Sequence, residues 1–217
     1  MTEVSGRPLR LIPTRFPPIP AFEGVAAPED LDAVMELEGW TNDRLVATRA
    51  ARISLAERAY GRPNASVVMA SFLHANPEGG RFNSGDLGAW YAARAERTAI
   101  AEVATGMRRE ARRAGLPVIE GAYRAYAAML KGDGYVDIRG TVPTDGILNP
   151  GDWRAGQVFG EAVRAGGGDG IVYPSVRHVG GENVVAYRPN QIFDVTVAAT
   201  FELTVPIEGS VTARRRT

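Results

Sequence analysis

The stretch from Pro77 to Val103, PEGGRFNSGDLGAWYAARAERTAIAEV, brings an arginine, a tyrosine and a glutamate close together in the chain. Arg81 directly follows two glycines, which expose backbone amides and let a ligand approach the main chain closely. A guanidinium at such a position can bind a phosphate or a carboxylate through two parallel hydrogen bonds. The stretch could therefore form one side of a pocket for a flat anion, whereas a surface ion pair is the commoner role of a loop arginine.

Tyr91 and Glu102 follow this loop on a predicted strand and a predicted helix. Tyr91 either packs in the core or offers its ring as a stacking surface and its hydroxyl as a polar handle. At 100° per residue, Glu102 lies beside the apolar stripe of its helix, and its flanking neighbours Ala95, Thr98 and Gly106 are small. We therefore expect Glu102 to stand beside a shallow gap; the alternative is a solvated helix glutamate.

A second group of polar residues lies in YPSVRHVGGENVVAYRP. Pro174 ends a predicted strand, and Ser175 and Arg177 point to one side if the extended geometry continues. Ser175 could hydrogen-bond a sugar, an amide or a phosphate, or belong to an ordinary turn. The chain has no nucleophile elbow, P-loop or G-x-G-x-x-G motif, which argues against a Ser-His-Asp hydrolase, an NTPase and a Rossmann dehydrogenase.

Composition narrows the function classes further. The chain has no cysteine and two histidines, so thiol catalysis and cysteine-based metal sites are excluded; we expect no metal and a cytoplasmic location. Lys plus Arg and Asp plus Glu both number 25, which provides no overall field for nucleic acid or a membrane surface. No apolar run approaches the ~20 residues of a membrane span, so we expect a soluble protein.

Hydrophobic patterning predicts an α+β fold in one domain spanning residues 1–217. Apolar residues at helical spacing predict helices within 27–45, 94–115 and 150–170, while 46–61 is ambiguous and 76–88 is a loop. The apolar segment 65–75 fits a buried strand or a short buried helix, and we favour the strand. We also expect strands at 89–93, 134–140, 170–174 and 183–189, the last two forming a hairpin. Residues 193–205 alternate as a strand with one buried face, and the tail 206–217 is expected to be frayed.

The two motif blocks GGRFNSGDLGAWYAARAERTAIAEV and GDWRAGQVFGEAVRAGGGDGIVYPSVRHVGGENVVAYRP closely resemble the RES domain, a family named for its Arg, Glu and Ser. The resemblance extends from about Thr14 to Ile192. It implies an ADP-ribosyltransferase-like fold, with a central mixed or antiparallel sheet flanked by helices. It also implies a toxin of a bacterial RES/Xre toxin–antitoxin pair.

The resemblance assigns catalytic roles to Arg81 in GGRFN, Glu102 in AIAEV and Ser175 in YPSVR. Some members instead carry a functional serine after the tryptophan of the DW motif, where this chain has Arg154. Residues expected to bind NAD⁺ are Arg15 in TRF, Gly80, Tyr91 and Arg177.

The implied activity is depletion of NAD⁺ by hydrolysis or phosphorolysis of the nicotinamide–ribose bond, through an oxocarbenium-like transition state. NAD⁺ is then a substrate, inorganic phosphate is a candidate co-substrate, and no other cofactor is expected. The expected partner is an Xre-type helix-turn-helix antitoxin that carries the DNA contact. The alternatives are an ADP-ribosyltransferase that modifies a protein, and a non-catalytic module that binds a nucleotide or an antitoxin.

Overall fold

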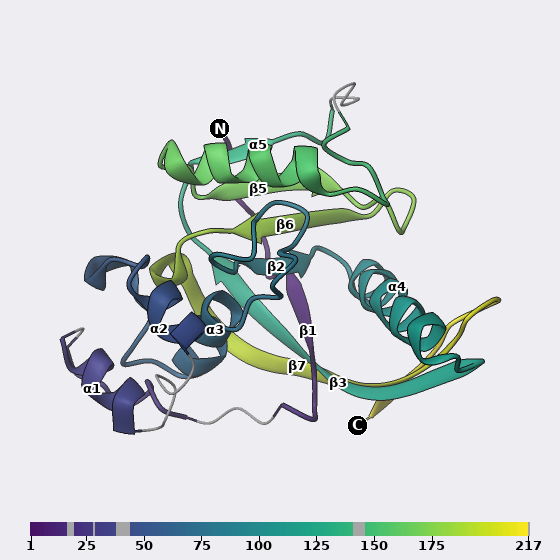
Figure 1. The fold of residues 1–217 in the computed structure, drawn as a ribbon, viewed down its shortest axis with the longest axis horizontal. Helices are drawn as coiled ribbons and strands as arrows, with labels where there is room; N and C mark the ends of the chain where they lie inside the picture. The colour runs from purple at the N-terminus through teal and green to yellow at the C-terminus, as the bar shows by residue number, and fades with distance from the viewer. Residues whose placement is uncertain (17–19, 28, 38–43, 141–145, 217) are drawn as a thin grey trace.

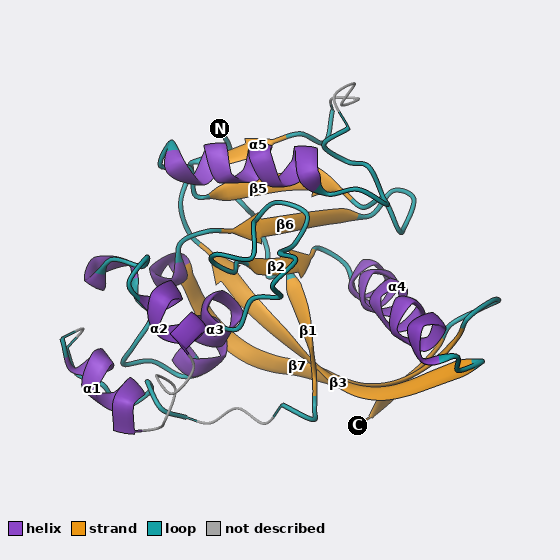
Figure 2. Cartoon of the chain, in the orientation of Figure 1, coloured by secondary structure: helices purple, strands orange, loops and turns teal. Residues whose placement is uncertain are grey.

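The computed structural model describes residues 1–16, 20–27, 29–37, 44–140 and 146–216. Within these residues the chain forms eight strands in one sheet and five α-helices (Figure 2). The helices are α1 (Asp30–Leu37), α2 (Arg44–Ala50), α3 (Ala65–Leu73), α4 (Glu96–Ala114) and α5 (Arg154–Ala165). The strands are β1 (Leu9–Pro13), β2 (Trp90–Ala93), β3 (Val118–Leu130), β4 (Tyr135–Asp137), β5 (Gly170–Pro174), β6 (Glu182–Ala186), β7 (Ile192–Pro206) and β8 (Thr212–Arg216).

The strand order is β4-β5-β6-β2-β1-β3-β7-β8. Only the β4–β5 pair is parallel, and the other pairs are antiparallel. The sheet is therefore mixed, and the predicted α+β class is confirmed. The predicted hairpin is also confirmed, because β5 pairs with β6 from Gly170↔Ala186 to Pro174↔Glu182.

The sheet opens between β2 and β1. β1 pairs with β2 only at Leu9↔Ala93, whereas it follows β3 over five pairs from Leu9↔Ala127 to Pro13↔Tyr123. β1 therefore runs away from β2 along the long β3 and β7 strands, as Figure 1 shows. Because the two strands separate after one pair, the space next to β2 is not occupied by a hydrogen-bonded neighbouring strand.

Helices cover both faces of the sheet. α1, α2 and α3 pack over one core cluster, which includes Trp90 of β2 and Val184 of β6. Val185, the next residue of β6, points to the opposite face, because successive strand residues alternate. There it belongs to a second cluster with Phe82 of the loop before β2, against which Phe159 of α5 packs. A third cluster joins α4 to β3 and β7 and includes Met107, Phe201, Leu203 and Val205.

The central helix α4 has the predicted extent and ends. Ala99, Ala104 and Met107 of the predicted apolar stripe are buried. Arg112 and Arg113 occupy its last turn, and Gly115 follows in the left-handed conformation with a φ of 66°. A basic last turn followed by a left-handed glycine is the usual end of an α-helix, so these residues explain where α4 stops.

The predicted strand at 65–75 is wrong, because Ala65–Leu73 forms helix α3. The segment is apolar on nearly every side, so its sequence lacks the periodicity that separates a buried helix from a buried strand. In the ambiguous segment 46–61, part of α2 is followed by a short 3₁₀ helix at Leu55–Glu57. None of the described helices has the length and apolarity needed to cross a bilayer.

The predicted strand at 193–205 is confirmed as β7, and Phe201, Leu203 and Val205 are buried as the alternation predicts. The alternation fails at Val197, which is 52% exposed, because irregularities in the β3–β7 pairing shift the faces. Asp194, three residues before Val197, has a φ of 47°. The tail is not frayed: β8 pairs with β7 from Thr204↔Thr212 to Thr200↔Arg216, and both Arg214 and Arg216 form ion pairs with Glu202 of β7.

Candidate active site

A cavity of about 300 Å³ lies where β1 leaves β2. Residues that are lateral neighbours across four strands contribute to its wall: Tyr173 of β5 pairs with Asn183 of β6, Asn183 with Ala93 of β2, and Ala93 with Leu9 of β1. Helix α4 completes the wall with Ala99, Glu102 and Val103, and Tyr91, Ala92, Arg10 and Leu11 also line it. The site is thus built from the divergence of two strands under one helix.

Glu102 is half-buried in this wall, and one of its oxygens is held from two sides. Its Oε1 accepts hydrogen bonds from Ser175 Oγ at 2.7 Å and from Asn183 Nδ2 at 2.6 Å. Its Oε2 receives no hydrogen bond from the residues that the structure describes. Ala99 and Val103 of the apolar stripe are its helix neighbours in the wall, whereas the predicted flanking residues Ala95, Thr98 and Gly106 do not line the cavity. The carboxylate is therefore fixed in orientation with one oxygen available to a ligand.

Ser175 is oriented as a donor by the turn that it begins. Its Oγ accepts hydrogen bonds from the backbone N–H groups of Arg177 and His178, both at 3.1 Å, which leaves its proton for Glu102. The extended geometry considered for Ser175 and Arg177 is therefore not present, because the chain turns after Pro174. Of the two positions considered for the family serine, Ser175 contacts Glu102, whereas Arg154 is exposed and pairs with Asp152 at 2.6 Å.

Tyr91 lines the cavity, but its hydroxyl is hydrogen-bonded within the neighbouring loop. The hydroxyl donates to Asn83 Oδ1 at 2.7 Å and accepts from the backbone N–H of Phe82 at 2.9 Å. Burial raises the pKa of Tyr91. A Cβ on Gly80 would lie 2.7 Å from this hydroxyl, so the glycine permits the close approach. The hydroxyl thus ties the loop to β2 and is not the free polar handle considered from the sequence.

Arg81 and Arg177 are not among the residues that line the cavity, but both bind one short segment next to it in the chain's fold, and Arg81 interacts electrostatically with Glu102. Arg81 Nη1 donates to the carbonyl oxygen of Asn149 at 2.7 Å, and Arg177 Nη2 donates to that of Pro150 at 2.6 Å. Burial lowers the pKa of Arg81, and the positive charge of Arg177 lowers it further while Glu102 opposes the change. Arg81 is therefore close enough to both Arg177 and the Glu102 carboxylate to interact with their charges.

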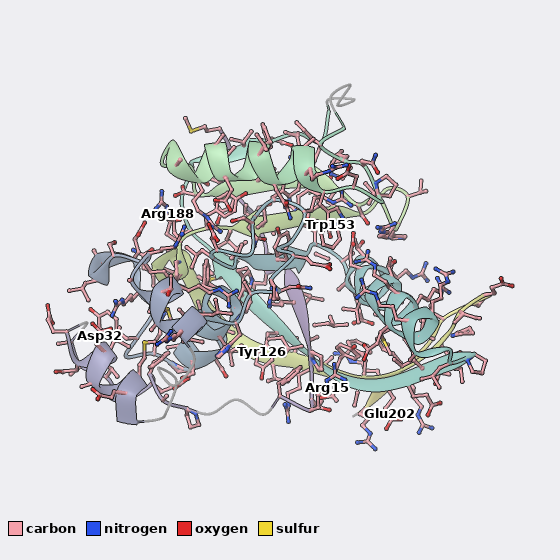
Figure 3. All side chains as sticks on the ribbon, in the orientation of Figure 1. Arg15, Asp32, Tyr126, Trp153, Arg188 and Glu202 are labelled. Atoms are coloured by element: carbon pink, nitrogen blue, oxygen red, sulfur yellow. The ribbon has the colours of Figure 1, made fainter. Side chains whose placement is uncertain are left out.

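Arg15 is not brought to this site. It follows the end of β1 that lies away from β2, where Figure 3 labels it, and it does not line the cavity. Its side chain is 65% exposed and lies 4.0 Å from Glu110 of α4. The divergence of β1 from β2 carries Arg15 away from the cavity.

Arg10, Tyr173 and Asn183 are site residues that the sequence analysis did not identify. Arg10 Nη1 donates to the carbonyl oxygen of Tyr91 at 3.2 Å, its Nε is buried without a partner, and burial lowers its pKa to about 10. Tyr173 is 6% exposed and burial raises its pKa far above the usual value. Arg10 and Asn183 share one signal in the sequence, a polar residue inside an apolar strand. Across the described ranges, no three His, Asp or Glu side chains are grouped to hold a metal ion.

Comparison with known proteins identifies the family. The model of the RES domain matches residues 52–206, which is more than half of the chain. The chain belongs to the RES domain family. A curated relative of this chain, the uncharacterized protein y4oC of Sinorhizobium fredii, is 38% identical over 93 residues, which are 42% of this chain and 40% of that protein. The chain thus matches less than half the length of this relative.

Among solved structures, the crystal structure of the M. tuberculosis MbcT–MbcA toxin–antitoxin complex aligns with a TM-score of 0.44 and 19% sequence identity. The alignment covers 60% of this RES chain and 74% of that chain.

Proposed function

We propose that this RES chain is a toxin-type enzyme that depletes NAD⁺ by cleaving the bond between nicotinamide and ribose. The observation that carries the proposal is the Glu102 carboxylate, held through Oε1 by Ser175 and Asn183 in the wall of a cavity. Membership of the RES family and the RES motifs agree with it.

Glu102 supplies the electrostatic part of the chemistry. When the glycosidic bond of NAD⁺ breaks, its electron pair moves to the pyridinium nitrogen, so nicotinamide leaves as a neutral molecule. Positive charge develops on the ribose, and a fixed carboxylate stabilises this charge more strongly than it stabilises the substrate. Water or phosphate then forms the new bond to the anomeric carbon, and water releases its proton. The products are ADP-ribose or ADP-ribose 1-phosphate.

Other residues bind the remaining parts of NAD⁺. The Tyr91 ring provides a flat wall for a heterocycle, and Arg81 and Arg177 bind the pyrophosphate. Both guanidinium groups point at one short segment, because they donate to the carbonyl oxygens of Asn149 and Pro150. A bound pyrophosphate would accept hydrogen bonds from the same N–H groups in place of these carbonyls.

Substitution of the carboxylate tests the proposal. Purified full-length protein should release nicotinamide from NAD⁺, and Glu102→Gln should lower the rate by about 10²-fold or more, as for other preorganised electrostatic groups. Glu110→Gln is the matched control, because Glu110 lies on the same helix and is exposed. A folded Glu102→Gln variant with undiminished release would contradict the role of Glu102.

The products identify the acceptor. Mass spectrometry of the reaction with and without phosphate separates ADP-ribose from its 1-phosphate. Label transferred from radiolabelled NAD⁺ to a protein would instead indicate an ADP-ribosyltransferase. NAD⁺ binding without turnover would indicate a non-catalytic module.

We also propose that the chain is neutralised by an Xre-type antitoxin, as the RES resemblance implies. The partner would carry the DNA contact, which suits the zero formal net charge of this chain.

A further inference from the structure

Strand β8 has an exposed outer edge. It lies at one end of the strand order, and its outer side pairs with no strand among the residues that the structure describes. Its inner side pairs with β7 over five consecutive residues without a bulge. All five residues of β8 are exposed, and none of them is a proline. Backbone N–H and C=O groups on the outer side are therefore accessible to another extended chain.

The same strand carries more positive charge than its surroundings compensate. Arg214 and Arg216 both pair with one carboxylate, that of Glu202 in β7, at 3.0 Å and 2.8 Å. Arg215 points to the opposite face of the sheet and donates to the carbonyl oxygen of Ala198 at 3.2 Å. It pairs with no carboxylate of the described ranges. One negative charge thus accompanies three consecutive guanidinium groups.

These charges make a second copy of β8 a poor occupant of the edge. A twofold antiparallel pairing that uses all five residues would place the two Arg214 side chains opposite each other, and like charges directly opposite destabilise a strand pair. A strand with carboxylates at these positions has the opposite effect, because each carboxylate that faces an arginine forms a favourable cross-strand pair.

The backbone of the edge distinguishes a peptide from a nucleic acid. Phosphate groups accept hydrogen bonds from arginine and from backbone N–H groups, but they have no donors for backbone C=O groups. An extended peptide supplies both donors and acceptors at the spacing of a β-ladder. The exposed edge and the excess charge therefore favour one class of ligand, a peptide that is extended and acidic.

We propose that the outer edge of β8 binds an extended, acidic segment of a partner protein, which adds a further strand to the sheet and places carboxylates beside Arg214, Arg215 and Arg216. This docking surface goes beyond the proposed cleavage of NAD⁺. No residue of β8 lines the cavity, so a segment bound at this edge leaves the cavity wall unchanged.

A synthetic peptide with blocked ends, Val-Thr-Glu-Glu-Glu-Val-Thr, tests the proposal on the full-length wild-type chain. Fluorescence anisotropy of the labelled peptide measures its Kd, and amide hydrogen exchange should show slower exchange in β8 when the peptide is bound. A second peptide carries N-methyl groups on its three glutamates, which keeps the charge but removes donors from both edges of the strand. Its Kd should be about tenfold higher or more.

Two charge reversals locate the binding surface. Arg215→Glu should raise the Kd of the unmodified peptide by about tenfold or more, because an attractive cross-strand pair becomes a repulsive one. Arg154→Glu is the matched control: Arg154 is exposed, lies on α5 and undergoes the same change of charge. It should leave the Kd unchanged. The two peptides are compared on the wild type, so a poorly folded variant does not affect that result.

Absence of peptide binding to the wild type would overturn the proposal and show that the arginines only protect the edge from pairing. Equal binding of the N-methylated peptide, or an equal effect of Arg154→Glu, would overturn it in favour of unspecific attraction between charges. Tighter binding of a short DNA duplex in the same salt would assign the edge to nucleic acid, and a dimer with protected β8 amides would assign it to a second copy. The test involves no NAD⁺, so its outcome is independent of the proposed function.

Discussion

The charged side chains in and near the cavity differ in how many hydrogen-bond partners and opposite charges surround them. Glu102 has two donors, and Arg81 has the Asn149 carbonyl and the nearby carboxylate. Arg10 has no carboxylate partner among the described residues, only the Tyr91 carbonyl and the face of the Trp90 ring at 5.2 Å. A guanidinium left in this state is destabilising by itself, and a bound anion would relieve it.

Arg10→Met should therefore separate stability from binding. We expect the free energy of unfolding of the ligand-free protein to rise by about 1 kcal/mol, because an unpaired buried charge is replaced by an apolar side chain. We expect ADP-ribose to stabilise the variant less than it stabilises the wild type. Thermal unfolding with and without ADP-ribose measures both effects. A variant that is less stable but keeps the full ligand-induced shift would show that Arg10 has only a structural role.

At the scale of elements, α5 positions the loop that carries Arg81. Gly156 and Gly160 are four residues apart and so lie on one helix face. A Cβ on Gly160 would lie 2.1 Å from the carbonyl oxygen of Phe82, and one on Gly156 would lie 2.5 Å from that of Arg81. The two glycines thus allow the loop backbone to rest directly on the helix.

Gly160→Ala should force the loop and the helix apart. We expect a loss of stability of about 1–3 kcal/mol, typical of overpacking, together with reduced NAD⁺ cleavage because Arg81 moves. Gly106→Ala on α4 is the matched substitution, since a Cβ there meets no atom within 4 Å, and it should raise stability by about 0.5–1 kcal/mol. Chemical denaturation of both variants provides the measurement. A neutral Gly160→Ala would disprove the close packing.

For the whole molecule, the sheet is divided into a short part and a long part that separate beside β2. The short part consists of β4, β5, β6 and β2; Tyr91 lies in β2, Asn183 in β6, and Ser175 directly after β5. The long part contains β3 and β7, and helix α4, which carries Glu102, packs on it through Met107 against Phe201. The geometry of the site therefore depends on the packing of α4 against both parts of the sheet. Glu102→Gln leaves this packing in place, so it should remove the activity without unfolding the protein.

In cells, expression of the wild-type chain alone should arrest growth and lower NAD⁺, because the proposed reaction consumes a coenzyme that growth requires. Glu102→Gln should abolish the arrest, Glu110→Gln should retain it, and co-expression of the proposed antitoxin should restore growth. Growth curves and cellular NAD⁺ provide the readouts. Equal arrest by a folded Glu102→Gln variant would separate toxicity from the proposed chemistry.

The sequence by itself determined the features that depend on neighbouring residues. The helical period and terminal glycine predicted α4, the alternation and turn residues predicted β5 and β6, and the motifs identified the RES family. They also pointed to Glu102, Tyr91 and Ser175, which the structure brings together. These signals are local because an element buries one face with a fixed period.

Only the tertiary structure decided which distant groups meet. Glu102 lies 73 residues from Ser175 and 81 residues from Asn183, and no spacing rule links positions so far apart. The strand order places Asn183 beside Glu102, and the divergence of β1 removes Arg15 from the site. Likewise, the apolar segment at Ala65–Leu73 became a helix because packing, not periodicity, selected its conformation. Local sequence fixes the faces of elements, and the order in which they pack fixes the chemistry between them.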